Sequence, residues 1–174
     1  MELAVIKNVS LLGLLLIASL TDLSRGRIPN SVTFTGIIGA MVLHTAIHGS
    51  AGLQFWLMGI TLGFMLLVPV YAMGGIGAGD VKLLMAVGGL VGPGNLMKIF
   101  IIASLVGGFW SLALALRRWG LQQTVRRTWI WMKVWHGTGR ILADAGQDQR
   151  NSILRYAPVL AVGTLLVQLW RSLI

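Results

Sequence analysis

The chain has 174 residues, of which 56% are hydrophobic and 11% charged, and its mean hydropathy is +0.80. A soluble domain carries about a quarter charged residues, so this composition excludes an ordinary soluble enzyme, a disordered chain and a protein that binds only the membrane surface. The 14 Lys and Arg residues outnumber five acids and give a net charge of +9, which topology explains better than nucleic acid, because cytoplasmic loops collect basic residues.

The apolar residues fall into runs long enough to suggest membrane helices. Since about 20 apolar residues cross a bilayer, the length allows roughly six spans in a single membrane domain covering residues 1–174. We therefore predict an all-α, polytopic membrane protein. The expected helices cover residues 3–21, 31–48, 53–73, 81–91, 96–116 and 153–174. No small-x-small cleavage site precedes Asp22, so the first run is predicted to be a retained span, not a signal peptide.

Polar or glycine-rich segments separate these runs. The first is the turn 22–30, in which Pro29 marks the start of a new helix, and the second is the neutral link 49–52. Pro69 is expected to kink the third run. The glycines of residues 74–79 cannot lie inside a stable helix, because each Gly costs roughly 1 kcal/mol relative to Ala. The turn 92–95 precedes the fifth run.

The chain changes character between residues 117 and 155, where eight Lys and Arg residues are interleaved with four Trp. Both residue types favour the membrane interface, so we predict a basic, amphipathic cytoplasmic segment over 117–152. With this segment and the turn 22–30 inside, the basic residues left outside are Lys7, Lys98 and Arg171. This bias predicts that both termini lie outside.

Asp22 and Asp80 stand out among the acids because each lies at an end of an apolar run, on the predicted cytoplasmic side. Taken singly, each has a structural explanation: Asp80 follows glycines and is a suitable N-cap, and Asp22 could open a polar turn. Taken together, two carboxylates on the same membrane face can hold one water molecule between them, and one then has a high pKa and the other a low one. Such a pair provides the acid and the base of aspartic proteolysis.

Other polar groups give weaker indications. His44 and His48 are spaced to share a helix face, but no carboxylate is expected beside them, so no metal site is predicted; His136 is expected to be solvated. The absence of cysteine excludes a thiolate zinc site and a thiol nucleophile. Lys82 does not share a helix face with Asp80. Its role stays open between reaching toward lipid headgroups, lowering the pKa of Asp80 and binding substrate.

Two segments resemble one known family. Residues Gly77-Ala78-Gly79-Asp80 match the G-x-G-D signature of intramembrane aspartyl proteases, and Lys82 extends it to G-x-G-D-x-K, as in type IV prepilin peptidases. Upstream, Asp22 with Ile28-Pro29-Asn30 is similar to the first-aspartate loop of those peptidases, and Tyr156-Ala157-Pro158 also fits. The resemblance covers nearly the whole chain.

The resemblance implies an aspartyl endopeptidase of the bacterial cytoplasmic membrane that needs no cofactor. Asp22 and Asp80 are then the catalytic pair that cuts a prepilin or pseudopilin leader at the cytoplasmic face, after a glycine that precedes the substrate's apolar helix. The residues expected to form the substrate-binding loops are Gly77, Gly79, Lys82, Ile28, Pro29 and Asn30. Longer family members carry paired cysteines for zinc and usually methylate the new N-terminus; this chain resembles the short, tight-adherence (Flp-type) form, and methyl transfer is not carried over.

Two other classes of protein stay open. A proton-coupled carrier would use the acids as protonation sites, but it is expected to place them near the midplane and often to show repeats. A structural assembly subunit of a secretion or pilus machine would leave the paired motifs unexplained. The expected partners are the prepilin-like substrate and the lipid bilayer, with no nucleic acid; a homo-oligomer is left open.

Overall fold

Helices alone make up the ordered elements of the computed structural model, which describes residues 2–72, 76–137 and 156–173. They are α1 (Glu2–Arg25), α2 (Asn30–Ala72), α3 (Ala78–Val91), α4 (Pro93–Gly137) and α6 (Tyr156–Leu173). The predicted all-α class is therefore confirmed.

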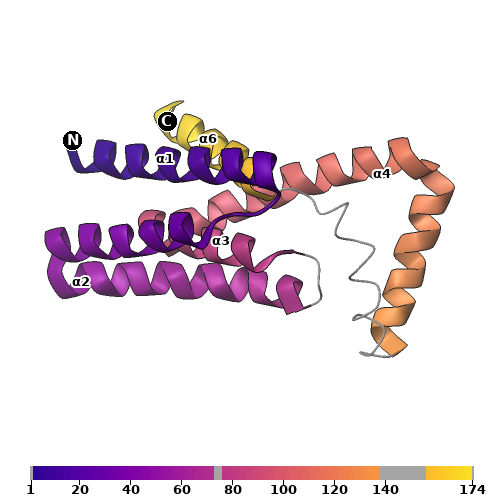
Figure 1. Cartoon of the computed structure of the whole chain (residues 1–174), viewed down its shortest axis with the longest axis horizontal. Helices are drawn as coiled ribbons and strands as arrows, with labels where there is room; N and C mark the ends of the chain where they lie inside the picture. The colour runs from indigo at the N-terminus through magenta and orange to yellow at the C-terminus, as the bar shows by residue number, and fades with distance from the viewer. Residues whose placement is uncertain (1, 73–75, 138–155, 174) are drawn as a thin grey trace.

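Helix α2 folds back on itself at Gly49 (Figure 1). This residue has φ 57° and ψ −133°, a conformation that glycine adopts without the steric cost of a side chain. The indole Nε1 of Trp56 donates a hydrogen bond of 2.9 Å to the carbonyl oxygen of Ile37, so residues 50–72, the second arm, pack along residues 30–48, the first arm. The predicted link 49–52 thus shrinks to a one-residue break. Pro69 lies inside the second arm.

Three segments of the described helices are long and apolar enough to cross a membrane: Ile6–Arg25, Asn30–Ala72 and Pro93–Leu114. Residues Ala157–Gln168 of α6 form a shorter apolar segment, and α3 has 14 residues. The protein is thus a multi-pass helical membrane protein with three to four apolar spanning helices. The predicted count of six requires each arm of α2 and the short α3 to be counted as separate crossings.

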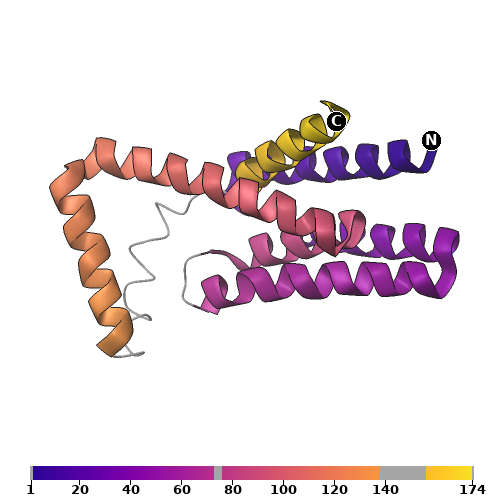
Figure 2. The ribbon, with the colours of Figure 1, turned by 180° about the vertical axis from the view of Figure 1, so that it is seen from behind.

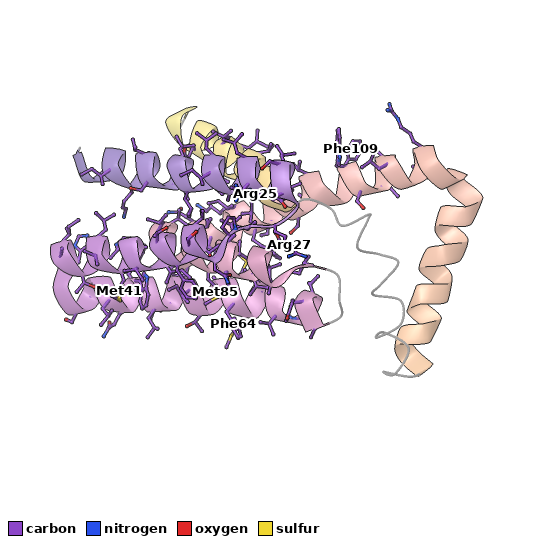
Figure 3. The ribbon with its side chains drawn as sticks, in the orientation of Figure 1. Arg25, Arg27, Met41, Phe64, Met85 and Phe109 are labelled. Atoms are coloured by element: carbon purple, nitrogen blue, oxygen red, sulfur yellow. The ribbon has the colours of Figure 1, made fainter. Side chains whose placement is uncertain are left out.

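Large apolar side chains cover much of the surface of the described helices. Phe64 of α2 and Phe109 of α4, for example, are 47% and 76% exposed (Figure 3). An aqueous surface rarely shows so much contiguous apolar area, whereas lipid tails accept it. This surface supports the membrane assignment independently of helix length.

Helix α3 lies at the centre of the bundle. Its Leu83, Leu84 and Val87 are fully buried, and the same core includes Leu15 of α1 and Leu96 of α4. Views from both sides show α3 beside α2 and α4, with α6 against α1 (Figures 1 and 2). Any group that α3 carries is therefore held by packing from several neighbours.

The second arm of α2 approaches α3 most closely, and glycines make this possible. A Cβ on Gly59 would collide with the carbonyl group of Gly88, and one on Gly63 would lie 2.8 Å from the carbonyl oxygen of Leu84. Small residues let two membrane helices pack backbone to backbone. The contact fixes the position of α3 along α2.

The ends of the helices sort into two groups. The end of α1, both ends of α2 and the start of α3 meet at one end of the bundle, which we call the aspartate end (Figures 1 and 2). Arg25 and Arg27 lie at this end (Figure 3). The N-terminus, the break at Gly49 and the junction of α3 with α4 lie at the other. Asp22, in the last turn of α1, and Asp80, in the first turn of α3, therefore lie at the same end of the bundle.

Some predicted helix limits were wrong. α1 continues beyond residue 21 to Arg25, where Gly26 (φ 62°) donates to the carbonyl oxygen of Asp22 and ends the helix. α3 begins at Ala78 instead of residue 81. α4 does not stop at residue 116 but continues to Gly137 and bends along the way (Figures 1 and 2). The predicted basic segment is therefore helical up to residue 137, and its remainder lies outside the described residues.

Candidate active site

Asp22 lies in the last turn of α1 and is buried, with 7% of its surface exposed. The sequence predicted an acid that opens a turn, whereas the structure places it inside the helix. The turn starts only after Arg25, because Gly26 accepts the left-handed conformation that ends α1. The carboxylate is consequently held by a helical backbone at the aspartate end.

Asp80 lies in the first turn of α3 and is 8% exposed. It is not the N-cap that was predicted as its structural alternative: the N-cap is Gly77, with φ −83° and ψ 155°. Asp80 instead reaches back, and its Oδ2 accepts a hydrogen bond of 3.1 Å from the backbone N–H of Gly77. This is the carboxylate half of a capping box. Asp80 therefore stabilises the start of α3, and its Oδ1 is not used in that bond.

The two carboxylates interact electrostatically. Asp80 lies outside the three candidate membrane spans. Burial raises the pKa of Asp80 to about 6, the hydrogen bond from Gly77 opposes the shift, and the negative charge of Asp22 raises the pKa further. A buried carboxyl beside a second carboxylate favours the neutral form. The arrangement can thus keep a proton on Asp80 up to about pH 6, above the usual range of a carboxyl group.

The loop 26–29 packs directly against the start of α3. A Cβ built on Gly79 would lie 3.4 Å from the Cβ of Ile28 and 3.7 Å from its carbonyl oxygen. The two segments that sequence analysis singled out are therefore in contact, and the residue before Asp80 touches the loop that follows Asp22.

Lys82 makes a second contact between the same two segments. Its Nζ donates a hydrogen bond of 3.0 Å to Oδ1 of Asn30, and it lies 5.4 Å from the ring centre of Phe34. None of the roles left open for Lys82 anticipated these partners. Phe34 was missed entirely, although it follows Asn30 by one helical turn and so shares its face. That spacing was the available signal.

Metal binding finds no support among the described residues, which contain no group of three or more His, Cys, Asp or Glu side chains able to hold an ion. His44 is buried; its Nε2 is 3.1 Å from the carbonyl oxygen of Leu90, and its ring lies 4.8 Å from that of Phe55. His44 therefore packs inside the core, whereas His48 is exposed. The side chain of His136 lies outside the described residues.

Two further residues of the family motifs, Pro29 and Ala157, lie at the starts of helices. Pro29 precedes α2, and its carbonyl oxygen accepts the first backbone hydrogen bonds of that helix, from Val32 and Thr33. Of the segment 156–158, Ala157 is fully buried at the start of α6, in the same core as α1. Ala157 therefore packs in the interior.

The sequence is similar to those of known proteins. A model of the type IV leader peptidase family (Peptidase_A24) matches residues 9–112, which include both aspartates and the contacts described above. The chain is 26% identical over 167 residues to a Bacillus subtilis (strain 168) protein named prepilin leader peptidase/N-methyltransferase, covering 93% of this chain. The chain spans 54% of the length of that relative. No solved structure matches this chain.

Proposed function

Because the chain belongs to the type IV leader peptidase family, we propose that it is a membrane aspartyl endopeptidase that removes the leader of type IV prepilin-like proteins. The observation that supports this most directly is the pair of buried carboxylates, Asp22 and Asp80, whose charges interact at one end of the bundle. A merely structural acid in an apolar helix is costly near lipid. Two such acids within electrostatic reach are better explained by chemistry.

The proposed reaction uses the two aspartates in opposite protonation states. The ionised carboxylate takes a proton from a water molecule, whose oxygen forms a bond to the carbonyl carbon of the scissile peptide, while the protonated carboxyl donates its proton to the carbonyl oxygen. When the C–N bond breaks, the carboxyl that took the proton of the water passes it to the leaving nitrogen, and one hydroxyl of the diol intermediate returns its proton to the other carboxylate, so that a leader carboxyl and a free amine result. The raised pKa of Asp80 favours this residue as the acid and Asp22 as the base.

Gly77 and Gly79 border the proposed cleavage site. The extended backbone of Gly77 carries no side chain, and the nearest atom to a Cβ there would be Oδ2 of Asp80, at 3.5 Å. An extended substrate chain can therefore come close to the carboxylate. Ile28 and Pro29 lie on the facing loop, and Asn30 begins α2 directly after it. In this proposal the scissile bond follows a glycine and lies between the two loops.

The proposed orientation places the aspartate end in the cytoplasm of a bacterial cell, with both termini outside. Arg25 and Arg27 are exposed at that end, as the concentration of basic residues on the cytoplasmic side requires. The two arms of α2 and the short α3 count as separate crossings in this layout, which then has six, and Asp80 lies at the cytoplasmic end of α3. The proposal is limited to proteolysis and does not include methyl transfer.

The test is co-expression with a reporter that has a basic leader, a glycine and about 20 apolar residues, followed by an immunoblot that resolves leader removal. Asp22→Asn and Asp80→Asn should each accumulate normally and lose cleavage by several orders of magnitude. The double variant should be little worse than either single one, because members of a catalytic set are not additive. Asp144→Asn is the control and should cleave normally.

Asp80 needs a further comparison because it also caps α3. The amide oxygen of Asp80→Asn can still accept the hydrogen bond from Gly77, whereas Asp80→Ala cannot, so only the Ala variant should lose the roughly 1 kcal/mol that such a bond typically contributes. Both should be inactive. Normal cleavage by either Asn variant would contradict the catalytic pair and favour the carrier or the assembly subunit.

A further inference from the structure

The amine of Lys82 contacts two side chains of a neighbouring helix. Its Nζ donates to Oδ1 of Asn30, and the same amine lies over the ring of Phe34. Both partners belong to the first turns of α2, whereas Lys82 belongs to α3. The Lys82 clasp, defined as Lys82, Asn30 and Phe34, therefore joins α2, which follows the Asp22 segment, to α3, which carries Asp80.

The clasp lies directly beside the contact between Ile28 and Gly79. Asn30 follows Ile28 by two residues, and Lys82 follows Gly79 by three, so the hydrogen bond of 3.0 Å reinforces the approach of 3.4 Å between a Cβ at Gly79 and the Cβ of Ile28. A flexible loop alone would hold this approach weakly. An ammonium bound to an amide oxygen and an aromatic face, near the membrane boundary, restrains it.

Resting on the proposed function, we propose that Lys82 is a positioning residue for the catalytic pair. By fixing the first turn of α2 against the first turn of α3, it holds the loop that follows Asp22 against the residue that precedes Asp80. A variant without the clasp still has both carboxylates, but the distance between them is less restrained. A shift of about 1 Å in a catalytic group can cost about 100-fold in rate.

The chemistry of the clasp distinguishes Lys82 from a residue that only reaches toward headgroups. Arg keeps the charge, can donate to the Asn30 amide and stacks on aromatic rings, whereas Met keeps most of the length and apolar packing but cannot donate. Lys82→Arg should therefore cleave within about threefold of the native protein, and Lys82→Met should lose about 10- to 100-fold in kcat with little change in KM. The matched control is Lys98→Met, at an exposed lysine of α4, and it should be unchanged.

A cross-linking experiment measures how closely residues 28 and 79 approach each other, and it does not depend on activity. The sequence has no cysteine, so a pair made by Ile28→Cys and Gly79→Cys is the only one present. Its expected Cβ separation is near the 3.5 to 4.5 Å of a disulfide. In purified protein in detergent, mild oxidation should form the internal disulfide rapidly, and adding Lys82→Met should slow its formation several-fold, whereas adding Lys98→Met should not.

The two readouts separate failure of the clasp from failure of the proposed function. Slower cross-linking with Lys82→Met, together with no cleavage by the native protein, would leave the clasp standing and refute the peptidase. Equal cross-linking rates for the Lys82→Met and Lys98→Met backgrounds would overturn the clasp, as would full kcat in Lys82→Met. An Asn30→Ala variant that adds its full loss to that of Lys82→Met would also overturn it, because partners in one contact are not additive.

Discussion

The crossing of α2 and α3 gives a quantitative test of the fold that positions Asp80. A Cβ on Gly59 would collide with the backbone carbonyl of Gly88, which cannot rotate away as a side chain can. Non-bonded heavy atoms sit about 3.5 Å or more apart, so the helices of a Gly59→Ala variant must separate by more than about 1 Å. Overpacking of this kind costs about 1–3 kcal/mol. The displaced helix is the one that carries Asp80.

Gly39→Ala is the matched control, since Gly39 lies in the same helix and a Cβ there would meet no atom within 4 Å. At such a site Ala is worth up to about 1 kcal/mol over Gly in a helix. Because Gly59→Ala has the same gain in helix propensity, the two variants should differ by the cost of overpacking, about 1–3 kcal/mol in the free energy of unfolding. Cleavage by Gly59→Ala should also fall, by up to about 100-fold for a shift of 1 Å.

Unfolding is measured by circular dichroism of the purified variants titrated with denaturing detergent, beside the reporter cleavage assay. If Gly59→Ala unfolds at the same detergent concentration as Gly39→Ala, the close crossing is absent. If it is destabilised but cleaves at the native rate, the position of α3 does not control the chemistry.

Two further predictions concern pH and topology. Because the pKa of Asp80 is raised to about 6, its proton is lost as the pH rises through that value; cleavage in a pH series should fall there, and an alkaline limb near the ordinary carboxyl value of about 4 would contradict Asp80 as the acid. The raised pKa also means that Asp80 contributes stability at low pH that is lost as the pH rises through about 6. The stability of Asp80→Asn relative to the native protein should therefore increase as the pH rises through the same range. Membrane-impermeant thiol labelling should reach Ser50→Cys from outside and Arg25→Cys only from the cytoplasm, and labelling of Ser50→Cys from the cytoplasm alone would reverse the layout.

Much of the fold could be predicted from the apolar runs and from the helix-breaking glycines between them. The apolar runs located the helices because a membrane helix must be apolar along its whole length, and Gly49 and Gly92 marked breaks that the structure has, with φ 57° and 78°. The limits of α1 and α3 were less predictable, because a helix continues into polar residues until a backbone conformation ends it. Gly26 does so for α1, and Gly77 precedes the start of α3.

The contacts of the candidate site were less accessible to sequence reasoning than its residues. The motifs identified Asp22 and Asp80 but gave no partner for Lys82, because Asn30 belongs to another helix and their approach depends on how α2 folds back and meets α3. Helical spacing excludes Lys82 from the face of Asp80 and says nothing about which helix it faces instead. The core role of His44 was hidden for the same reason, since its partner Leu90 lies in α3.

The contacts of Asp80 are compatible with both the structural explanation and the proposed catalytic one, which the sequence could not separate. Its Oδ2 caps α3 through Gly77, an interaction that favours the ionised form, whereas burial and the charge of Asp22 favour the neutral form. Burial is the larger effect, so the net pKa is raised. A cap at Oδ2 fixes the carboxyl group in space and leaves Oδ1 to carry a proton. In the proposed mechanism the same residue therefore starts the helix and supplies the acid, and the fixed geometry that the cap provides suits proton transfer to a substrate carbonyl.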